Sequence, residues 1–122
     1  MDAITVIIPT YNEEAYIAQA IQSVDFASQV IVVDSNSTDN TVQIAKQMGC
    51  EVYLRAFDNF SNQKNHALQF AKGEWILFVD ADERIPYALQ QEIFEAIKSN
   101  KHAGYKLNFP HYYMNRFLYH HS

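Results

Sequence analysis

Short apolar runs alternate with amphipathic helical patterns along most of this chain, and no other feature restricts the fold as strongly. The apolar runs predict buried strands at 4–9, 30–34 and 75–79, and a further strand is expected at 51–54. Apolar residues at helical spacing predict helices at 13–24, 39–49, 61–73 and 86–99, with Gly49 and Gly73 as helix ends. A further strand is expected at 104–109. This order predicts an α/β fold, with a mostly parallel sheet and helices on both faces.

The composition bounds the class of protein. With 122 residues, 48% of them hydrophobic, the chain is long enough for one domain with a real core. Its net charge of −5 and its lack of a basic stretch argue against nucleic acid as a partner. The single cysteine, Cys50, excludes an internal disulfide and fits a reducing compartment. Neither a signal peptide nor a run of the ~20 apolar residues that cross a bilayer is present, so we expect a cytoplasmic location.

Polar side chains follow three of the expected strands, at the point where each strand ends. These residues are Thr10, Tyr11 and Glu13 after the first strand, Asp34 after the second, and Asp80 and Asp82 after the fourth. Ligands of parallel α/β sheets bind beyond the carboxyl ends of the strands. The convergence of the three groups on one edge therefore predicts a binding site there.

Each group also has an ordinary structural explanation. Asn12 is suited to cap the first helix, as Thr38 or Asp39 is suited to cap the second. Lysines such as Lys64 are usually solvated. The segment from Asp80 to Glu83 carries three acids in four positions, and two unit charges about 4 Å apart repel by roughly 4 kcal/mol at an effective dielectric of ~20. Such a cluster is tolerated if its acids face water, cap a helix or share a cation.

The residue types at this edge favour one ligand chemistry over others. The chain has neither the G-x-G-x-x-G turn of dinucleotide-binding proteins nor the G-K-[ST] of P-loops. Asp80 and Asp82 would repel a phosphate group unless a divalent cation such as Mg²⁺ or Mn²⁺ lay between them. An aromatic ring, hydrogen-bond acceptors and a pair of acids together suit a base, a sugar and a metal-bridged diphosphate. These are the parts of a nucleotide-sugar.

Four motifs resemble, in the same order, those of the N-terminal half of glycosyltransferase family 2, which has the Rossmann-like GT-A fold. They are VIIPTYNEE (6–14), VVDSNSTDNT (32–41), NQKNHAL (62–68) and FVDADERIP (78–86). The family's usual forms of the last three are V-D-D-G-S-x-D-x-T, A-R-N-x-G/A and a D-x-D strand end. The combination is most similar to the branch that includes β-1,4-glucosyltransferases of lipopolysaccharide or lipooligosaccharide core assembly.

The resemblance implies a role for each of the residues at this edge. Thr10, Tyr11 and Glu13 would line the nucleoside site, with Asp34 on the base or ribose. Lys64 would approach the diphosphate, while Asp80 and Asp82 would contact ribose and metal. Two positions depart from the family pattern: Ser35 replaces the second acid of the D-D pair, and Lys64 replaces an arginine that would bind bidentately.

The resemblance also implies an inverting transferase that acts on a UDP-linked donor and a cell-envelope glycan or glycolipid. Residues 1–109 would form the nucleotide-sugar-binding half, and 110–122 the start of the acceptor-side region, so that the fold is expected to be truncated. The general base, a downstream carboxylate in this family, is expected beyond Ser122, and no catalytic residue is assigned. The aromatic tail at 109–119 would favour self-association, and peripheral association with the inner face of the cytoplasmic membrane stays open. A metal role for His111, His120 or His121 is not favoured.

Other classes fit the chain less well. The strongest rival is a truncated module that binds the nucleotide-sugar without transferring it. A signalling receiver domain needs an aspartate at the end of the third strand, where this chain has Leu54 and Arg55. A sugar-nucleotide pyrophosphorylase needs a glycine-rich loop after the first strand, and PTYNEE is not one.

Overall fold

Strands from both halves of the chain form one sheet, in the order β3-β2-β1-β4-β6-β5. The structure is a computed structural model that describes residues 3–99, 105–107 and 116–120. The strands are β1 (Ile4–Thr10), β2 (Gln29–Asp34), β3 (Glu51–Leu54), β4 (Trp75–Phe78), β5 (Tyr105–Leu107) and β6 (Arg116–His120). The helices are α1 (Ile17–Gln22), α2 (Thr41–Gln47), α3 (Phe60–Leu68) and α4 (Tyr87–Ser99).

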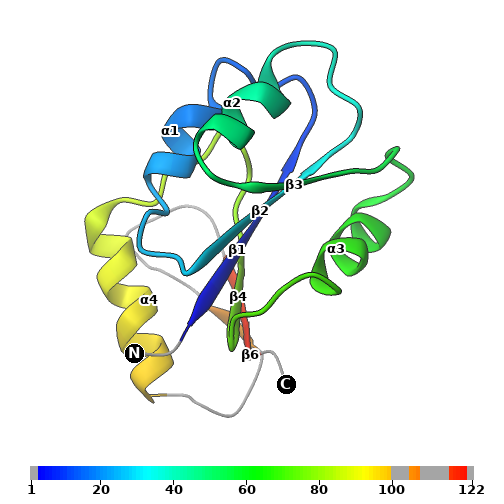
Figure 1. The fold of residues 1–122 in the computed structure, drawn as a ribbon. Helices are drawn as coiled ribbons and strands as arrows, with labels where there is room; N and C mark the ends of the chain where they lie inside the picture. The colour runs from blue at the N-terminus through cyan, green and yellow to red at the C-terminus, as the bar shows by residue number, and fades with distance from the viewer. Residues whose placement is uncertain (1–2, 100–104, 108–115, 121–122) are drawn as a thin grey trace.

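The first four strands run parallel, as their order along the chain predicts. β1 pairs with β2 and with β4, and β2 pairs with β3, all in parallel register. β6 then pairs antiparallel with β4 on one side and with β5 on the other. The carboxyl ends of β1, β2, β3 and β4 therefore meet at one edge of the sheet, in the upper part of Figure 1.

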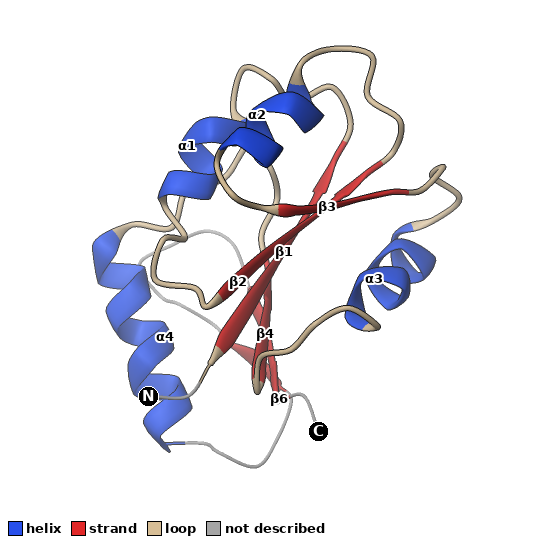
Figure 2. Ribbon diagram, viewed as in Figure 1, coloured by secondary structure: helices blue, strands red, loops and turns tan. Residues whose placement is uncertain are grey.

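Helices cover both faces of the sheet, which explains why its strands are apolar on both sides. α1, α2 and α4 lie on one face and α3 on the other (Figure 2). Along β1, Ile4, Val6 and Ile8 face the larger core with the three helices, and Ile7 faces the smaller core with α3. The expected α/β architecture is confirmed.

The helices are shorter than their sequence patterns predict. α1 begins at Ile17, and Tyr16, which we expect on its apolar face, is 53% exposed. α2 ends in the expected way, because Gly49 adopts a φ of 87° and its N–H donates to the Lys46 carbonyl while that of Cys50 donates to Ala45. α3 ends at Leu68, so the expectation that Gly73 terminates it is wrong.

The C-terminal part contributes two strands to the sheet. β5 forms within the segment expected at 104–109, and β6 is an element that the sequence reading did not anticipate. Leu118 of β6 is fully buried in the larger core. The expected division of the chain at residue 109 falls outside the described residues and stays a prediction. Across the described residues, no helix is both long and apolar enough to span a membrane.

Candidate functional site

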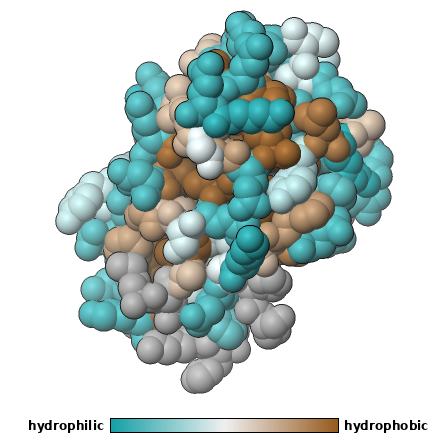
Figure 3. Space-filling model, in the orientation of Figure 1, coloured by the Kyte–Doolittle hydropathy of each residue, from teal (hydrophilic) through white to brown (hydrophobic). Residues whose placement is uncertain are grey.

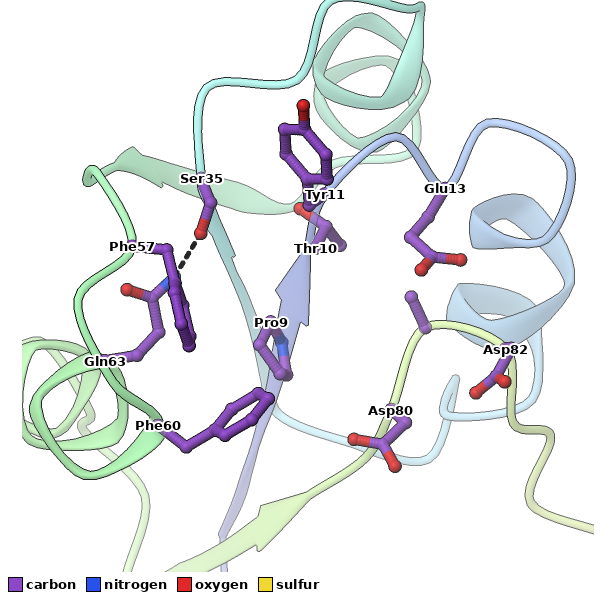
Figure 4. Close-up of a pocket in the computed structure, with 11 residues that line it drawn as sticks. Pro9, Thr10, Tyr11, Glu13, Ser35, Phe57, Phe60, Gln63, Asp80 and Asp82 are labelled. Atoms are coloured by element: carbon purple, nitrogen blue, oxygen red, sulfur yellow. Dashed lines mark hydrogen bonds between the residues drawn. The ribbon is translucent and has the colours of Figure 1, made fainter.

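A pocket of about 620 Å³ opens at the carboxyl edge of the parallel strands. Its lining comes from the end of β1 and from the segments that follow β1, β2, β3 and β4: Pro9, Thr10, Tyr11, Glu13, Ser35, Phe57, Phe60, Gln63, Asp80, Ala81 and Asp82. Figure 4 shows Phe57 and Phe60 on one side of this space and Asp80 and Asp82 on the other, with Pro9 and Thr10 between them. The pocket thus has an aromatic side and an acidic side.

The acidic side is built by a tight turn after β4. Glu83 is buried, and its Oε1 accepts the N–H of Asp80 at 2.8 Å, while the Asp80 carbonyl accepts the N–H of Glu83 at 3.0 Å. Asp80 and Asp82 are exposed and line the pocket. The three acids therefore have different positions: Glu83 closes the turn, and Asp80 and Asp82 are exposed at the pocket.

Glu13 lies near these acids and responds to them electrostatically. Its carboxyl is half-buried, and desolvation raises its pKa above the ordinary value of 4.5. Repulsion from Asp82, Asp39 and Asp80 raises the pKa further. A cation at this side of the pocket would relieve that repulsion.

Asn12 connects the loops after β1 and β2. Its Oδ1 accepts the N–H of Thr38 at 2.8 Å, and its own N–H donates to Ser37 Oγ at 2.8 Å. The backbone of Asn12 is in the left-handed region, with a φ of 51°. The expectation that Asn12 caps the first helix is therefore wrong. The expectation that Thr38 or Asp39 is the N-cap of the second helix is also wrong, because Asn40 holds that position; Asp39 precedes it, and its Oδ1 accepts the N–H of Thr41 at 3.0 Å.

Asp34 lies behind the pocket wall and is fully buried. Thr10 Oγ1 donates to its Oδ1 at 2.7 Å, Ser37 Oγ donates to the same oxygen at 2.6 Å, and the Ser37 N–H donates to Oδ2 at 2.7 Å. In this arrangement Asp34 holds the loops that form the pocket. Its expected contact with base or ribose stays a prediction.

Lys64 is the other predicted residue outside the lining. It lies on α3, and its Nζ is 5.1 Å from the centre of the Phe78 ring, at the end of β4. The structure thus brings together Thr10, Tyr11, Glu13, Asp80 and Asp82, and leaves Asp34 and Lys64 beside the pocket.

The sequence reading missed the aromatic side of the pocket. Phe57 and Phe60 are 51% and 66% exposed, and their rings meet edge to face at 5.1 Å. They lie in the segment after β3 and at the start of α3, and Gln63 follows one turn later. The same rule about strand ends that identified the other groups would have found them, had it been applied to the third strand.

The acidic side of the pocket offers part of a ligand set for a divalent cation. The described residues hold no group of three or more His, Cys, Asp or Glu side chains that could bind a metal by themselves. Asp80 and Asp82 nevertheless supply two exposed carboxylates of the kind that Mg²⁺ and Mn²⁺ prefer. They suit a cation that takes its remaining oxygen ligands from water and a bound diphosphate.

The sheet order and the pocket at its carboxyl edge define a protein of the GT-A fold, as solved structures support. Glucosyl-3-phosphoglycerate synthase from Mycobacterium tuberculosis, solved with Mn²⁺, UDP and glucosyl-3-phosphoglycerate, superimposes with a TM-score of 0.59 and 27% identity. The match covers 68% of this chain and 36% of that one. Residues 5–122 match the profile of Glycosyl transferase family 2, and the chain belongs to this family.

Two relatives illustrate the range of similarity. An uncharacterized glycosyltransferase of Rickettsia felis is 40% identical over 111 residues, which is 88% of this chain and 39% of the relative. A lipopolysaccharide core biosynthesis glycosyltransferase of Rhizobium meliloti is 29% identical over 94 residues, which is 73% of this chain and 35% of the relative. The chain thus spans about two fifths of the length of the curated relatives it matches.

Proposed function

We propose that this protein transfers a sugar, with inversion, from a nucleoside-diphosphate donor, UDP-linked, to a cell-envelope glycan or glycolipid such as lipopolysaccharide core. Family membership supports the reaction class. UDP in the mycobacterial synthase supports the choice of nucleotide, and the lipopolysaccharide role of the Rhizobium relative supports the choice of acceptor.

The observation that carries the proposal is the division of the pocket into an aromatic side and an acidic side. A nucleobase is flat and suits the rings of Phe57, Phe60 and Tyr11. A diphosphate is anionic, so it suits Asp80 and Asp82 only together with a cation. The pocket volume of about 620 Å³ lies within the usual range for small-molecule sites.

Asp80 and Asp82 are the residues that would hold the cation, Mn²⁺ or Mg²⁺. When bound, the cation supplies positive charge that stabilises the departing diphosphate. Glu13 stands close enough for its pKa to respond to both aspartates, so it adds to the negative field that attracts a cation.

Transfer itself requires an acceptor hydroxyl. Its oxygen forms a bond to the anomeric carbon as the bond from that carbon to the diphosphate breaks, and a general base takes the hydroxyl proton. We assign no described residue to that base. A cytoplasmic enzyme that meets its acceptor at the inner face of the membrane fits this chemistry, since nucleotide-sugar and glycolipid would meet there.

The first test concerns the cation. UDP should bind the 122-residue chain more tightly with Mn²⁺ than with a chelator, as measured by calorimetry. Asp80→Asn and Asp82→Asn should each weaken binding in Mn²⁺ by about 10-fold or more, because each removes a charged ligand. Asp25→Asn changes an exposed acid before β2, at the opposite edge of the sheet, and serves as the matched control.

Equal UDP affinity with Mn²⁺ and with chelator would remove the cation from the proposal. A second measurement distinguishes a transferase from a module that only binds. The chain is incubated with UDP-sugars and lipopolysaccharide-core acceptors, and UDP release is followed. Tight UDP binding without acceptor-dependent release would favour the binding module.

A further inference from the structure

β3 forms one edge of the sheet, and its outer side carries backbone groups that face no neighbouring strand. Arg55, directly after β3, donates its N–H to the Asp34 carbonyl of β2 at 2.9 Å. In a parallel pair, alternate residues direct both their N–H and their C=O to the neighbouring strand. The residues between them, Val52 and Leu54, therefore direct these groups outward, where the described part of the chain has no further strand.

The side chains of the same two residues make this edge apolar on one face. Val52 is half-buried against the larger core, and Leu54, two residues later on the same face, is 62% exposed. A lysine, a proline or a bulge protects many native edge strands from other chains, and β3 contains none of these. The edge is thus open to a further strand.

The other face of β3 carries charges of opposite sign around one aromatic ring. Tyr53 stacks on Phe70 with ring centres 3.8 Å apart, and Glu51 and Arg55 stand two residues to either side of it. The segment 51–55 therefore reads acid, apolar, aromatic, apolar, base. An antiparallel copy of the segment, centred on Tyr53, places Glu51 opposite Arg55. A shift of two residues in either direction would place one of these charges opposite Tyr53 instead.

Both charged groups retain capacity for a partner in a second copy. The two oxygens of Glu51 accept one bond each, from the Tyr53 hydroxyl and from the Gln29 amide, both at 2.8 Å, and a carboxylate oxygen can accept more than one. Arg55 pairs with Asp58 at 2.7 Å and 3.1 Å, and a guanidinium has more N–H donors than these bonds use. The Arg55 side chain is 25% exposed, so it is accessible to a second carboxylate.

We propose that this protein associates with a second copy of itself through β3, as an antiparallel pair of edge strands with a two-fold axis at Tyr53. Val52 and Leu54 of opposite copies exchange backbone hydrogen bonds, and Glu51 pairs with Arg55 on each side of the axis. The same surface is used by both copies, so the contact closes as a dimer and extends the sheet across it. Arg55 also donates to Gln63 of the pocket lining at 3.4 Å, so the interface borders the aromatic side of the pocket.

Sedimentation velocity of the 122-residue chain over a range of concentrations tests for the dimer. We expect reversible dimerisation with a Kd of about 10–100 µM, as suits a small interface. Leu54→Lys should weaken it by about 10-fold or more, because a charge then lies on the apolar pair at the edge. Tyr87→Lys is the matched control: this apolar side chain is 74% exposed on α4, away from β3 (Figure 1), and the dimer should persist.

A mixing experiment tests the register. Glu51→Lys and Arg55→Glu should each dimerise about 10-fold more weakly than wild type, because like charges then face each other on both sides of the axis. Mixed together, the two variants again place opposite charges at both positions, so a heterodimer should form with nearly the wild-type affinity. Glu74→Lys and Lys72→Glu make the same charge changes at exposed positions before β4, and these controls should dimerise as wild type does, alone or mixed.

Each result supports or overturns the proposal. A wild-type chain that stays monomeric up to about 500 µM, well above the expected Kd, has no such dimer. If a dimer forms and Leu54→Lys leaves it intact, another surface holds the two copies and the assignment to β3 is wrong. If the two charge variants, folded by circular dichroism, weaken the dimer and their mixture does not restore it, the register centred on Tyr53 is wrong.

Discussion

Carboxylates of the same chemical type serve different purposes within this small protein. Asp34 and Glu83 are buried and accept hydrogen bonds that hold loops, whereas Asp80 and Asp82 are exposed at the pocket. Glu13 lies between these cases, because it is half-buried and borders the acidic side. The environment of each side chain, rather than its identity, decides whether it supports the fold or meets a ligand.

Glu13 should make the stability of the ligand-free chain depend on pH. Its pKa is raised in the folded state, so that state binds the proton more tightly than the unfolded chain does. The associated stability is present below the ordinary value of 4.5 and is lost as the pH rises through the raised pKa. Glu13→Gln has no such loss, so it should be more stable than wild type at neutral pH, with the gain vanishing in acid.

Urea denaturation followed by fluorescence of Trp75, the single tryptophan, across this pH range and in chelator measures the effect. Glu74→Gln, an exposed acid just before β4, is the control for removing a negative charge. If both variants gain the same stability at every pH, the repulsion at Glu13 has no consequence for folding.

The sequence predicts which residues gather at the pocket better than it predicts where each one points. Thr10, Tyr11, Asp80 and Asp82 line the pocket because strand ends meet there. Asp34 also ends a strand, yet its carboxylate is buried and accepts from Thr10 of β1 and from Ser37 three residues later. Thr10 becomes its neighbour only after folding, so the local pattern does not reveal that contact.

At the scale of elements, short apolar runs and glycines predict boundaries with unequal success. β3 forms at the residues expected, although it is an edge strand that is only half-buried and leaves Leu54 exposed. β6 was missed because its pairing with β4 joins segments about 40 residues apart along the sequence.

Exposed aromatic residues that the helical patterns do not explain gather at the ends of elements. Figure 3 shows hydrophobic surface reaching solvent in the upper part of the molecule, where the carboxyl ends of the parallel strands lie.

Two glycines make a matched pair of tests for the connections between elements. A Cβ on Gly73 would lie 2.7 Å from the backbone nitrogen of Thr5, which cannot move without disturbing β1. Gly73→Ala should therefore lower the free energy of unfolding by about 3 kcal/mol. Gly49 has open space around its Cα, and only its φ of 87° opposes a side chain, so Gly49→Ala should lose about 1–2 kcal/mol.

Chemical denaturation of the two variants compares these losses directly. The order is the informative result, since both substitutions add one methyl group. If Gly49→Ala loses more free energy of unfolding than Gly73→Ala does, the segment before β4 can move away from β1 at little cost in stability.

For the whole molecule, charge is the dominant long-range property. The net charge is −5, and Asp39, Asp80 and Asp82 repel the Glu13 carboxylate at the pocket edge. An anionic nucleotide approaching this edge meets a field of its own sign. A divalent cation held by the two aspartates after β4 would make the local field positive, so that an anionic nucleotide could approach in spite of the negative net charge.

This field predicts an unusual response to salt. In chelator, raising the ionic strength should strengthen UDP binding, because screening over a Debye length of about 8 Å at physiological salt reduces the repulsion. With Mn²⁺ saturating, the same change should weaken UDP binding, because the bound cation now attracts the diphosphate. Uridine has no phosphate and should respond to neither change, which makes it the control ligand. Calorimetric titrations of UDP and uridine at low and high NaCl, each with chelator and with Mn²⁺, measure all four cases. If salt weakens UDP binding in chelator as well, a cationic group such as Lys64 outweighs the acids at the pocket even without metal.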